Sequence, residues 1–353
     1  MNHQYPLVSI AVTTYNGARY LRQQLDSLLA QDYPSLEIVV ADDCSTDNTR
    51  AILVEYECHE NFRWYKNAKN LGYIKNFEHV IKRCRGEYIA LCDQDDEWYT
   101  DKITKTLAFL HEKDALLAYC DADLIAADNS KIGMNLLSHS PTGPIDGGEY
   151  EKFYLLNTVN GCTALFRREL FDQAAPFPID VPHDWWLSYI AAFDGRLAHT
   201  ADRLMGYRMH ANNTIGISYR IKKRNLKQYL RRKLSRYSKR FIYDKTVRPV
   251  KWGQECLEHF ERFKAFEEGR GKTTTILNVL TDWMNAKMSN DARVEEYRSF
   301  FFEHHQRLGI KMRSLLFMTI RKELIRAKIK LCYTLASPLL FVILLLCVIW
   351  TVL

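Results

Sequence analysis

The sequence predicts an α/β fold with a mostly parallel central sheet, followed by a C-terminal helical region. Two observations support this prediction. Short apolar runs of strand length alternate with amphipathic helical patterns through the first part of the 353-residue chain, and such alternation is typical of a parallel sheet covered by helices. The composition, with 47% apolar and 26% charged residues, is that of a folded protein and not of a disordered one.

The expected strands are short apolar runs that end in polar or turn-forming residues. They cover residues 7–13, 36–41, 62–65, 87–92 and 116–123. Apolar residues at helical spacing predict helices through residues 21–29, 52–56 and 77–81, and another that begins near residue 184. In a parallel sheet the carboxyl ends of the strands meet at one edge, where ligands bind.

Acidic side chains accumulate at that expected edge. Asp42 and Asp43 follow the second strand, and Asp93, Asp95 and Asp96 follow the fourth. Three carboxylates within four residues repel one another, and a bound divalent cation such as Mg²⁺ or Mn²⁺ would relieve the repulsion. The alternative is a polar turn that caps the next helix. Because carboxylates recur at the ends of separate strands, the pattern favours a metal site.

The charge of the chain is divided sharply. Residues 1–217 contain 20 basic and 30 acidic residues, whereas residues 218–353 contain 29 basic and 12 acidic residues. Residues 220–240 carry eleven basic residues and no acidic one, with apolar residues at helical spacing, which predicts a helix on an anionic membrane surface. A solvated helix face and nucleic-acid binding are the alternatives, and the acidic first part argues against nucleic acid.

Residues 331–353 are a run of 23 residues without a charge, long enough to cross a bilayer as a helix. A buried core helix and a helix that lies at the interface are the alternatives. Basic residues precede this run, so the positive-inside rule places the main body in the cytoplasm. We therefore expect a sheet domain at residues 1–217, a basic helical membrane-proximal region at 218–330, and a transmembrane or membrane-inserted helix at 331–353.

Three stretches of the expected sheet domain resemble glycosyltransferase family 2. They are residues 8–16 (VSIAVTTYN), 39–47 (VVADDCSTD) and 86–96 (GEYIALCDQDD). The resemblance covers about residues 5–217 and implies a catalytic domain with the GT-A fold that uses a nucleotide-diphosphate sugar. The Asp-Gln-Asp-Asp stretch followed by Trp98, with His-Asp-Trp-Trp at residues 183–186, looks most similar to the bacterial rhamnosyltransferase-like members.

The resemblance also implies roles for individual residues. Thr13, Tyr15, Asp43 and Asp93 match the positions that hold the nucleotide, while Asp95, Asp96 and His210 match those that bind Mn²⁺ or Mg²⁺. Asp184 matches the catalytic base, although it could also cap the helix that follows. The remaining matches lie near the donor or acceptor: Asn160, Gly161, His183, Trp185 and Arg208, the last as a phosphate contact. For Cys162, a packed small side chain is favoured over a nucleophile.

These expectations combine into one predicted function. The enzyme would move one sugar from dTDP-rhamnose, or from a UDP-hexose, to a cell-surface polysaccharide or a lipid-linked oligosaccharide, with inversion and with a divalent cation. It would act at the cytoplasmic face of the cell membrane and bind no nucleic acid. The alternatives are a non-catalytic nucleotide-sugar-binding subunit of a polysaccharide assembly complex, and a nucleotidyl transferase that releases pyrophosphate.

Overall fold

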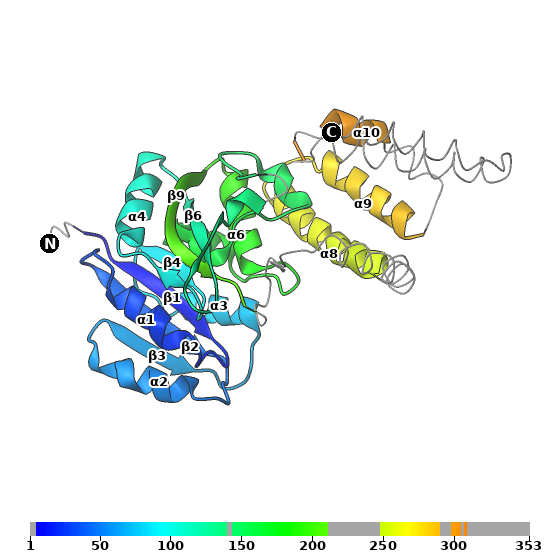
Figure 1. Cartoon of the computed structure of the whole chain (residues 1–353). Coiled ribbons are helices and arrows are strands. Elements are labelled where there is room, and N and C mark those ends of the chain that lie inside the picture. The colour runs from blue at the N-terminus through cyan, green and yellow to red at the C-terminus, as the bar shows by residue number, and fades with distance from the viewer. Residues whose placement is uncertain (1–4, 140–142, 211–247, 290–297, 305–306, 309–353) are drawn as a thin grey trace, which may run out of the picture.

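The computed structural model describes residues 5–139, 143–210, 248–289, 298–304 and 307–308, which form a sheet domain and a set of C-terminal helices (Figure 1). The sheet has nine strands in the order β3-β2-β1-β4-β8-β6-β9-β5, and β7 pairs with β6. The strands are β1 (Val8–Thr14), β2 (Leu36–Asp42), β3 (Phe62–Lys66), β4 (Tyr88–Cys92), β5 (Glu97–Trp98), β6 (Leu117–Ile125), β7 (Lys131–Asn135), β8 (Ala164–Arg167) and β9 (Leu197–Arg208).

Helices cover both faces of the sheet, which explains why its central strands are apolar throughout. In β1, Ile10 belongs to the core cluster that includes residues of α1 and α4 on one face, while Ala11 belongs to the cluster that includes residues of α3 and α6 on the other. The helices of the sheet domain are α1 (Leu21–Leu29), α2 (Thr49–Glu55), α3 (Tyr73–Ile81), α4 (Lys102–Glu112), α5 (Arg168–Ala174) and α6 (His183–Phe193). Short 3₁₀ turns are η1 (Tyr56–Cys58), η2 (Leu137–His139), η3 (Tyr150–Tyr154) and η4 (Gly161–Thr163).

The sheet is mixed, so the expectation of a mostly parallel sheet is wrong for its second half. Strands β3, β2, β1 and β4 are parallel neighbours as expected, but β8 runs antiparallel to both β4 and β6. The strand β8 has only four residues, too short a run to stand out in the sequence. Its direction matters for the site, because it brings the start of β8 and the preceding turn η4 to the edge where β4 ends.

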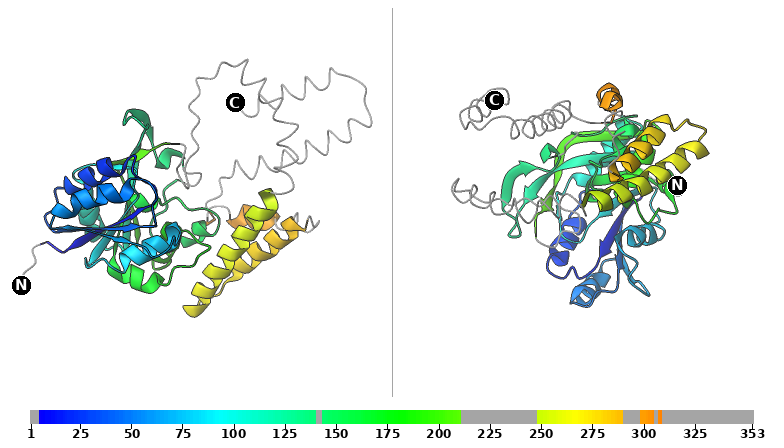
Figure 2. Two further views of the ribbon diagram at one scale, coloured as in Figure 1. Left: turned by 90° about the horizontal axis from the view of Figure 1, so that it is seen from below. Right: turned by 90° about the vertical axis from the view of Figure 1, so that its right-hand side faces the viewer.

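Among the C-terminal helices, α8 (Arg248–Gly269) packs against α6 through aromatic side chains. The other two are α9 (Thr275–Met288) and α10 (Arg298–His304), and α8 and α9 lie side by side (Figure 2). The rings of Tyr189 in α6 and Phe263 in α8 have centroids 4.2 Å apart. The buried carboxylate of Glu267 in α8 accepts hydrogen bonds from the hydroxyls of Tyr154 and Tyr189, at 2.5 and 2.8 Å. These contacts join α8 to the helix that begins with His183 and Asp184.

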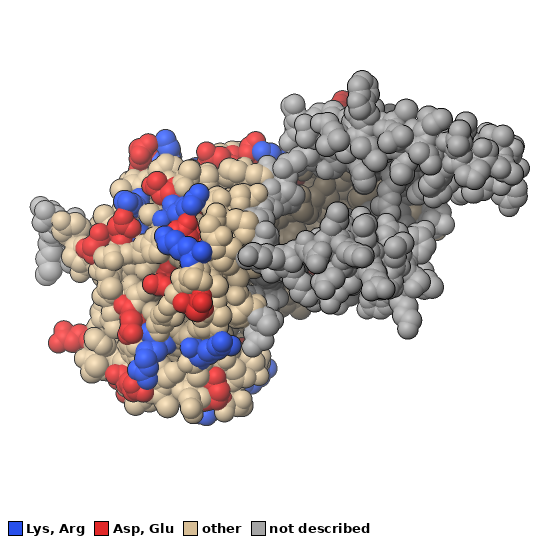
Figure 3. All heavy atoms as spheres, viewed as in Figure 1, with Lys and Arg blue, Asp and Glu red and all other residues tan. Residues whose placement is uncertain are grey.

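The basic segment at residues 220–240 and the apolar run at residues 331–353 lie outside the described residues. None of the helices within the described ranges combines the length and the hydropathy that a membrane-spanning helix needs. On the face drawn in Figure 3, basic and acidic side chains are interspersed over the sheet domain. The expected division at residues 217 and 330 stays a prediction.

Replacing Glu267 tests the attachment of α8. Glu267→Ala leaves the buried hydroxyls of Tyr154 and Tyr189 without their acceptor, and each such loss costs about 1–3 kcal/mol. We therefore expect the free energy of unfolding to fall by about 2–6 kcal/mol, measured by chemical denaturation with tryptophan fluorescence. The matched control is Glu268→Ala, which changes the exposed neighbour on the same helix. Equal stability of the two variants would contradict the role of Glu267.

Candidate functional site

One edge of the sheet gathers the ends of several strands. Strands β1, β2 and β4 end there, β9 ends there because it runs parallel to β6, and the antiparallel β8 begins there. The side chain of Gln94 joins two of these ends, since its Oε1 atom accepts hydrogen bonds from the Thr14 hydroxyl at 2.7 Å and from the Tyr15 backbone N–H at 2.9 Å. The loops after β1 and β4 are thereby held as one surface.

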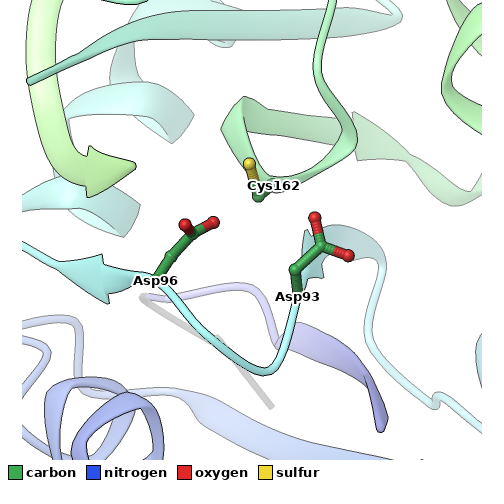
Figure 4. Close-up of side chains that lie close together, drawn as sticks. All are labelled: Asp93, Asp96 and Cys162. Atoms are coloured by element: carbon green, nitrogen blue, oxygen red, sulfur yellow. The ribbon is translucent and has the colours of Figure 1, made fainter. Parts of the chain in front are cut away.

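The carboxylates of Asp93 and Asp96 face the thiol of Cys162 across this edge (Figure 4). One ligand atom from each of the three residues lies within 4.8 Å of the others. Asp96 is buried, and its Oδ1 atom accepts the backbone N–H of Arg208 at 3.0 Å, whereas within the described chain its Oδ2 atom has no hydrogen-bond partner. Burial, with the charge of Asp95, raises the pKa of Asp96 to about 7.

This arrangement fits a divalent cation. Carboxylate oxygens suit Mg²⁺ and Mn²⁺, and a cation would give the Asp96 Oδ2 atom a partner. The pKa of Asp93 is raised well above its usual range, mainly by burial and then by the neighbouring carboxylates. A cation would also relieve the repulsion among these carboxylates. Burial also raises the pKa of the Cys162 thiol well above its usual range, so the thiol stays protonated and the carboxylates are the better ligands. Sequence reasoning placed Asp93 with the nucleotide and did not foresee Cys162 beside the acidic pair.

The other two expected metal ligands lie together. The Nε2 atom of His210 is 2.7 Å from the Oδ2 atom of Asp95. His210 follows β9, and its ring stacks on Tyr20 with centroids 5.1 Å apart. Asp95 belongs to the same loop as Asp93 and Asp96, but among the described residues neither Asp95 nor His210 belongs to the group of ligand atoms that Asp93, Asp96 and Cys162 bring within 4.8 Å of one another.

Arg208 does not lie where a phosphate would reach it, and the expectation of a phosphate contact is wrong. Its side chain is fully buried. The guanidinium donates to the carbonyl oxygen of Asp95 at 2.7 Å and to Gln23 Oε1 at 3.0 Å, and it also contacts Asn129. A donor group with this many protein acceptors holds the shape of the Asp95–Asp96 loop, and it leaves the binding of anions to other groups.

A buried lysine, which the sequence reasoning missed, lies behind the acidic loop. The ammonium of Lys102, the first residue of α4, donates to the carbonyl oxygen of Cys162 at 2.5 Å and lies 3.3 Å from the centroid of the Trp98 ring. Burial lowers the pKa of Lys102. Its positive charge opposes the larger effect of burial on the pKa of Asp93 and Asp96. Lys102 therefore joins η4 to the acidic loop and offsets part of its charge.

The expected nucleotide contacts Thr13, Tyr15 and Asp43 come from the ends of β1 and β2. The Asp43 carboxylate accepts backbone N–H groups of Leu71 and Gly72, at 2.8 and 2.9 Å. Gly72 has φ of 75°, a conformation that glycine adopts without strain. Tyr15 is half exposed. These three residues share one end of the site, and the loop that ends at Gly72 holds Asp43 in place.

Asp184 lies in the first turn of α6, beside η4. Its Oδ1 atom accepts the Trp185 backbone N–H at 2.7 Å, and its Oδ2 atom accepts the Gly161 backbone N–H at 3.2 Å. Burial raises the pKa of Asp184 to about 6, closer to neutrality than an ordinary aspartate. The carboxylate is thus held by backbone donors and is also a stronger base, so the N-terminal position of Asp184 on the helix is compatible with a catalytic role.

The residues next to Asp184 differ in their surroundings. His183 is buried against Phe77, with ring centroids 4.0 Å apart. The Trp185 indole N–H donates to the Phe153 carbonyl oxygen at 2.7 Å. A Cβ atom at Gly161 would lie 3.0 Å from His183 Nε2, so the lack of a side chain there makes room for His183 and not only for a substrate. The carbonyl oxygen of Asn160 accepts from Thr163 and closes η4.

The comparisons with known proteins agree with this architecture. The model of Glycosyl transferase family 2 matches residues 9–174. TuaG of Bacillus subtilis, a glycosyltransferase named for teichuronic acid biosynthesis, is 32% identical over 194 residues, which cover 54% of this chain and 74% of TuaG. An uncharacterized glycosyltransferase of Rickettsia typhi is 31% identical over 201 residues, which cover 54% of this chain and 60% of that protein.

Solved structures match over most of the described fold. The structure of S. aureus TarS residues 1–349 in complex with UDP-GlcNAc superposes with a TM-score of 0.53 and 17% identity, covering 86% of this chain and 78% of that one. A second crystal structure of S. aureus TarS 1–349 superposes with a TM-score of 0.51 and 20% identity, covering 83% of this chain and 91% of that one. At this level of identity the likeness shows the fold alone.

The cation site can be tested by titration with Mn²⁺, with free Mn²⁺ followed by electron paramagnetic resonance. Asp96→Asn removes a ligand charge from the buried group, and we expect the affinity to fall by about tenfold or more, since even residues that only orient metal ligands have effects of this size. The control is Asp101→Asn, a nearby aspartate that pairs with Lys105 on the surface. Unchanged affinity in Asp96→Asn would contradict the assignment.

Proposed function

The chain belongs to glycosyltransferase family 2, and we propose that it transfers one sugar from dTDP-rhamnose or a UDP-hexose to a polysaccharide or lipid-linked oligosaccharide acceptor. The observation that supports this proposal most strongly is the position of Asp184. A partly buried carboxylate with a raised pKa, fixed by two backbone N–H groups, shares one sheet edge with the acidic pair Asp93 and Asp96. The narrower resemblance to rhamnosyltransferase-like members stays a prediction.

The residues of the edge suit a single displacement with inversion. Asp184 accepts the proton of the acceptor hydroxyl while that oxygen bonds to the anomeric carbon and the bond from this carbon to the diphosphate breaks. Because one group accepts the proton and the nucleoside diphosphate leaves with the bonding electrons, a second catalytic carboxylate is not required. Asp93 and Asp96 would hold the cation, with Asp95 and His210 as further expected ligands, and the cation would neutralise the charge of the departing diphosphate.

The proposed acceptor and donor classes are supported by what the similar proteins are named for or crystallised with. TuaG is named for teichuronic acid biosynthesis, which supports an acceptor from polysaccharide assembly. TarS was crystallised with UDP-GlcNAc, which supports a uridine nucleotide as one of the donor candidates. Asp43 and Tyr15 would bind its base and ribose.

The pH profile tests Asp184 as the base. A base must be ionised to act, so with the donor that turns over and saturating Mn²⁺, kcat/KM should rise with pH through about 6, the pKa of Asp184, and level off above it. Asp184→Asn should lower kcat by about 10²- to 10⁴-fold while the affinity for the nucleoside diphosphate stays the same. The control is Asp194→Asn at the other end of α6, which pairs with Arg270 on the surface.

These measurements also separate the proposal from its rivals. A non-catalytic nucleotide-sugar-binding subunit would bind the donor but show the same absence of turnover in the native protein and in Asp184→Asn. A nucleotidyl transferase would release pyrophosphate, which a phosphate assay detects. If the native protein neither hydrolyses nor transfers the sugar of dTDP-rhamnose, UDP-glucose or UDP-galactose, the proposed donor class is refuted.

We also propose that the chain works at the cytoplasmic face of the cell membrane, bound through residues 220–240 and 331–353. The support is the eleven basic residues of the first segment and the uncharged length of the second. Removing residues 331–353 should move the protein from the membrane fraction to the supernatant, measured by sedimentation of cell lysates at matched expression. Continued sedimentation with membranes would show that this segment is not the anchor.

A further inference from the structure

We propose that His183 and Tyr73 form a subsite that recognises a hydroxyl group of the donor sugar, next to the base Asp184. The inference rests on the proposed function and deepens it, because it names a group that distinguishes one nucleotide sugar from another. Asp184 is assigned to the reaction itself, whereas His183 and Tyr73 would select the sugar on which it occurs.

The first observation is that His183 is buried with its polar atoms unused. The side chain is 6% exposed, and among the described residues neither Nδ1 nor Nε2 has a hydrogen-bond partner. Buried polar atoms are almost always paired, because leaving one unpaired costs free energy. Other described residues, such as Ser188, also have an unpaired buried atom, but His183 has two and directly precedes Asp184, so we infer that a ligand pairs at least one of them.

The second observation is that the surroundings keep the imidazole uncharged. Burial lowers the pKa of His183 to about 3, so at neutral pH the ring has one N–H donor and one lone pair. A neutral ring of this kind suits an uncharged hydroxyl, which both donates and accepts, better than it suits a phosphate, which calls for a positive charge. The chemistry of His183 thus points to the sugar and away from the diphosphate.

The third observation is that neighbouring residues hold the ring in one orientation. The Phe77 ring stacks on it, with centroids 4.0 Å apart and 27° between the planes. The Tyr73 ring meets it edge-on, with centroids 6.0 Å apart. On the side of η4, Gly161 lacks the Cβ atom that would lie 3.0 Å from Nε2. A side chain held in this way is preorganised for a directional hydrogen bond.

The fourth observation is the position of the subsite between the two ends of the reaction. Tyr73 follows Gly72, whose N–H binds Asp43 at the nucleotide end, and His183 precedes Asp184, which also accepts the N–H of Gly161. Tyr73 is 39% exposed, and the charge of Asp184 contributes to the rise in its pKa after burial. The sugar of a donor must lie between its nucleotide and the attacking acceptor. Its hydroxyls would therefore lie beside Tyr73 and His183.

The test compares binding of the nucleoside diphosphate with binding of the nucleotide sugar. The probes are UDP and UDP-glucose, or the corresponding pair for whichever of dTDP-rhamnose, UDP-glucose and UDP-galactose the native protein hydrolyses fastest, all with Mn²⁺. His183→Phe retains a ring against Phe77 and removes both nitrogens. We expect the affinity for the diphosphate to stay within about twofold and the affinity for the nucleotide sugar to fall about tenfold.

Two further variants separate recognition from packing. His183→Asn again offers a neutral donor and acceptor and should recover part of the lost affinity. The control is Ser188→Ala, which removes a buried hydroxyl further along α6 that also has no partner among the described residues. This variant should leave both affinities unchanged. If His183→Phe does not fold, the comparison of His183→Asn with Ser188→Ala decides the question, because only the former should change the preference for the sugar.

Monodeoxy analogues of the nucleotide sugar identify the hydroxyl. The native protein should bind one analogue about tenfold more weakly than the parent sugar, and His183→Phe should bind that analogue and the parent equally. The inference is overturned if His183→Phe weakens the diphosphate and the nucleotide sugar to the same extent, or changes neither. Failure of the proposed function looks different, because the native protein itself would then turn over none of the donors.

Discussion

The site depends on how the fold compensates the negative charge of the carboxylates that lie at one edge of the sheet. Asp93, Asp95 and Asp96 lie within one loop. The pKa of Asp93 is raised first by burial, then by Asp95 and Asp96, and also by the nearby charge of Asp184. Burial makes such crowding more costly, since charges interact more strongly away from water. Within the described chain, the Lys102 ammonium opposes part of this effect at Asp93 and Asp96, and a divalent cation would supply further compensation.

Helix α6 connects this edge to the C-terminal helices. Its first turn presents His183 and Asp184 to the site, while further along the helix Tyr189 packs against Phe263 and donates to the buried Glu267. The helix is thus held at one end by η4, through the Gly161 N–H, and on its other face by α8. Helix α8 therefore fixes the helix that carries Asp184, the base in the proposed reaction.

The sequence predicted the features that depend on local pattern and missed those that depend on tertiary contacts. The parallel strands β1, β2, β3 and β4 and the acidic loop after β4 follow from short apolar runs that end in polar residues, and the family resemblance drawn from them is confirmed. The direction of β8 is decided by pairing with strands distant in the sequence, which a four-residue run does not reveal. Arg208 was misread and Lys102 was missed, because a charged residue is expected at the surface. Only the packed structure shows the buried acceptors of the two side chains.

Burial has opposite consequences for the two neighbouring residues at the start of α6. It disfavours the charged form of each group, so it raises the pKa of Asp184 to about 6 and lowers the pKa of His183 to about 3. At neutral pH the aspartate is therefore mostly ionised while the histidine is neutral. A protonated His183 would attract the Asp184 carboxylate and weaken it as a base. The same apolar environment thus suits Asp184 to the proposed role of base and His183 to the proposed contact with an uncharged hydroxyl.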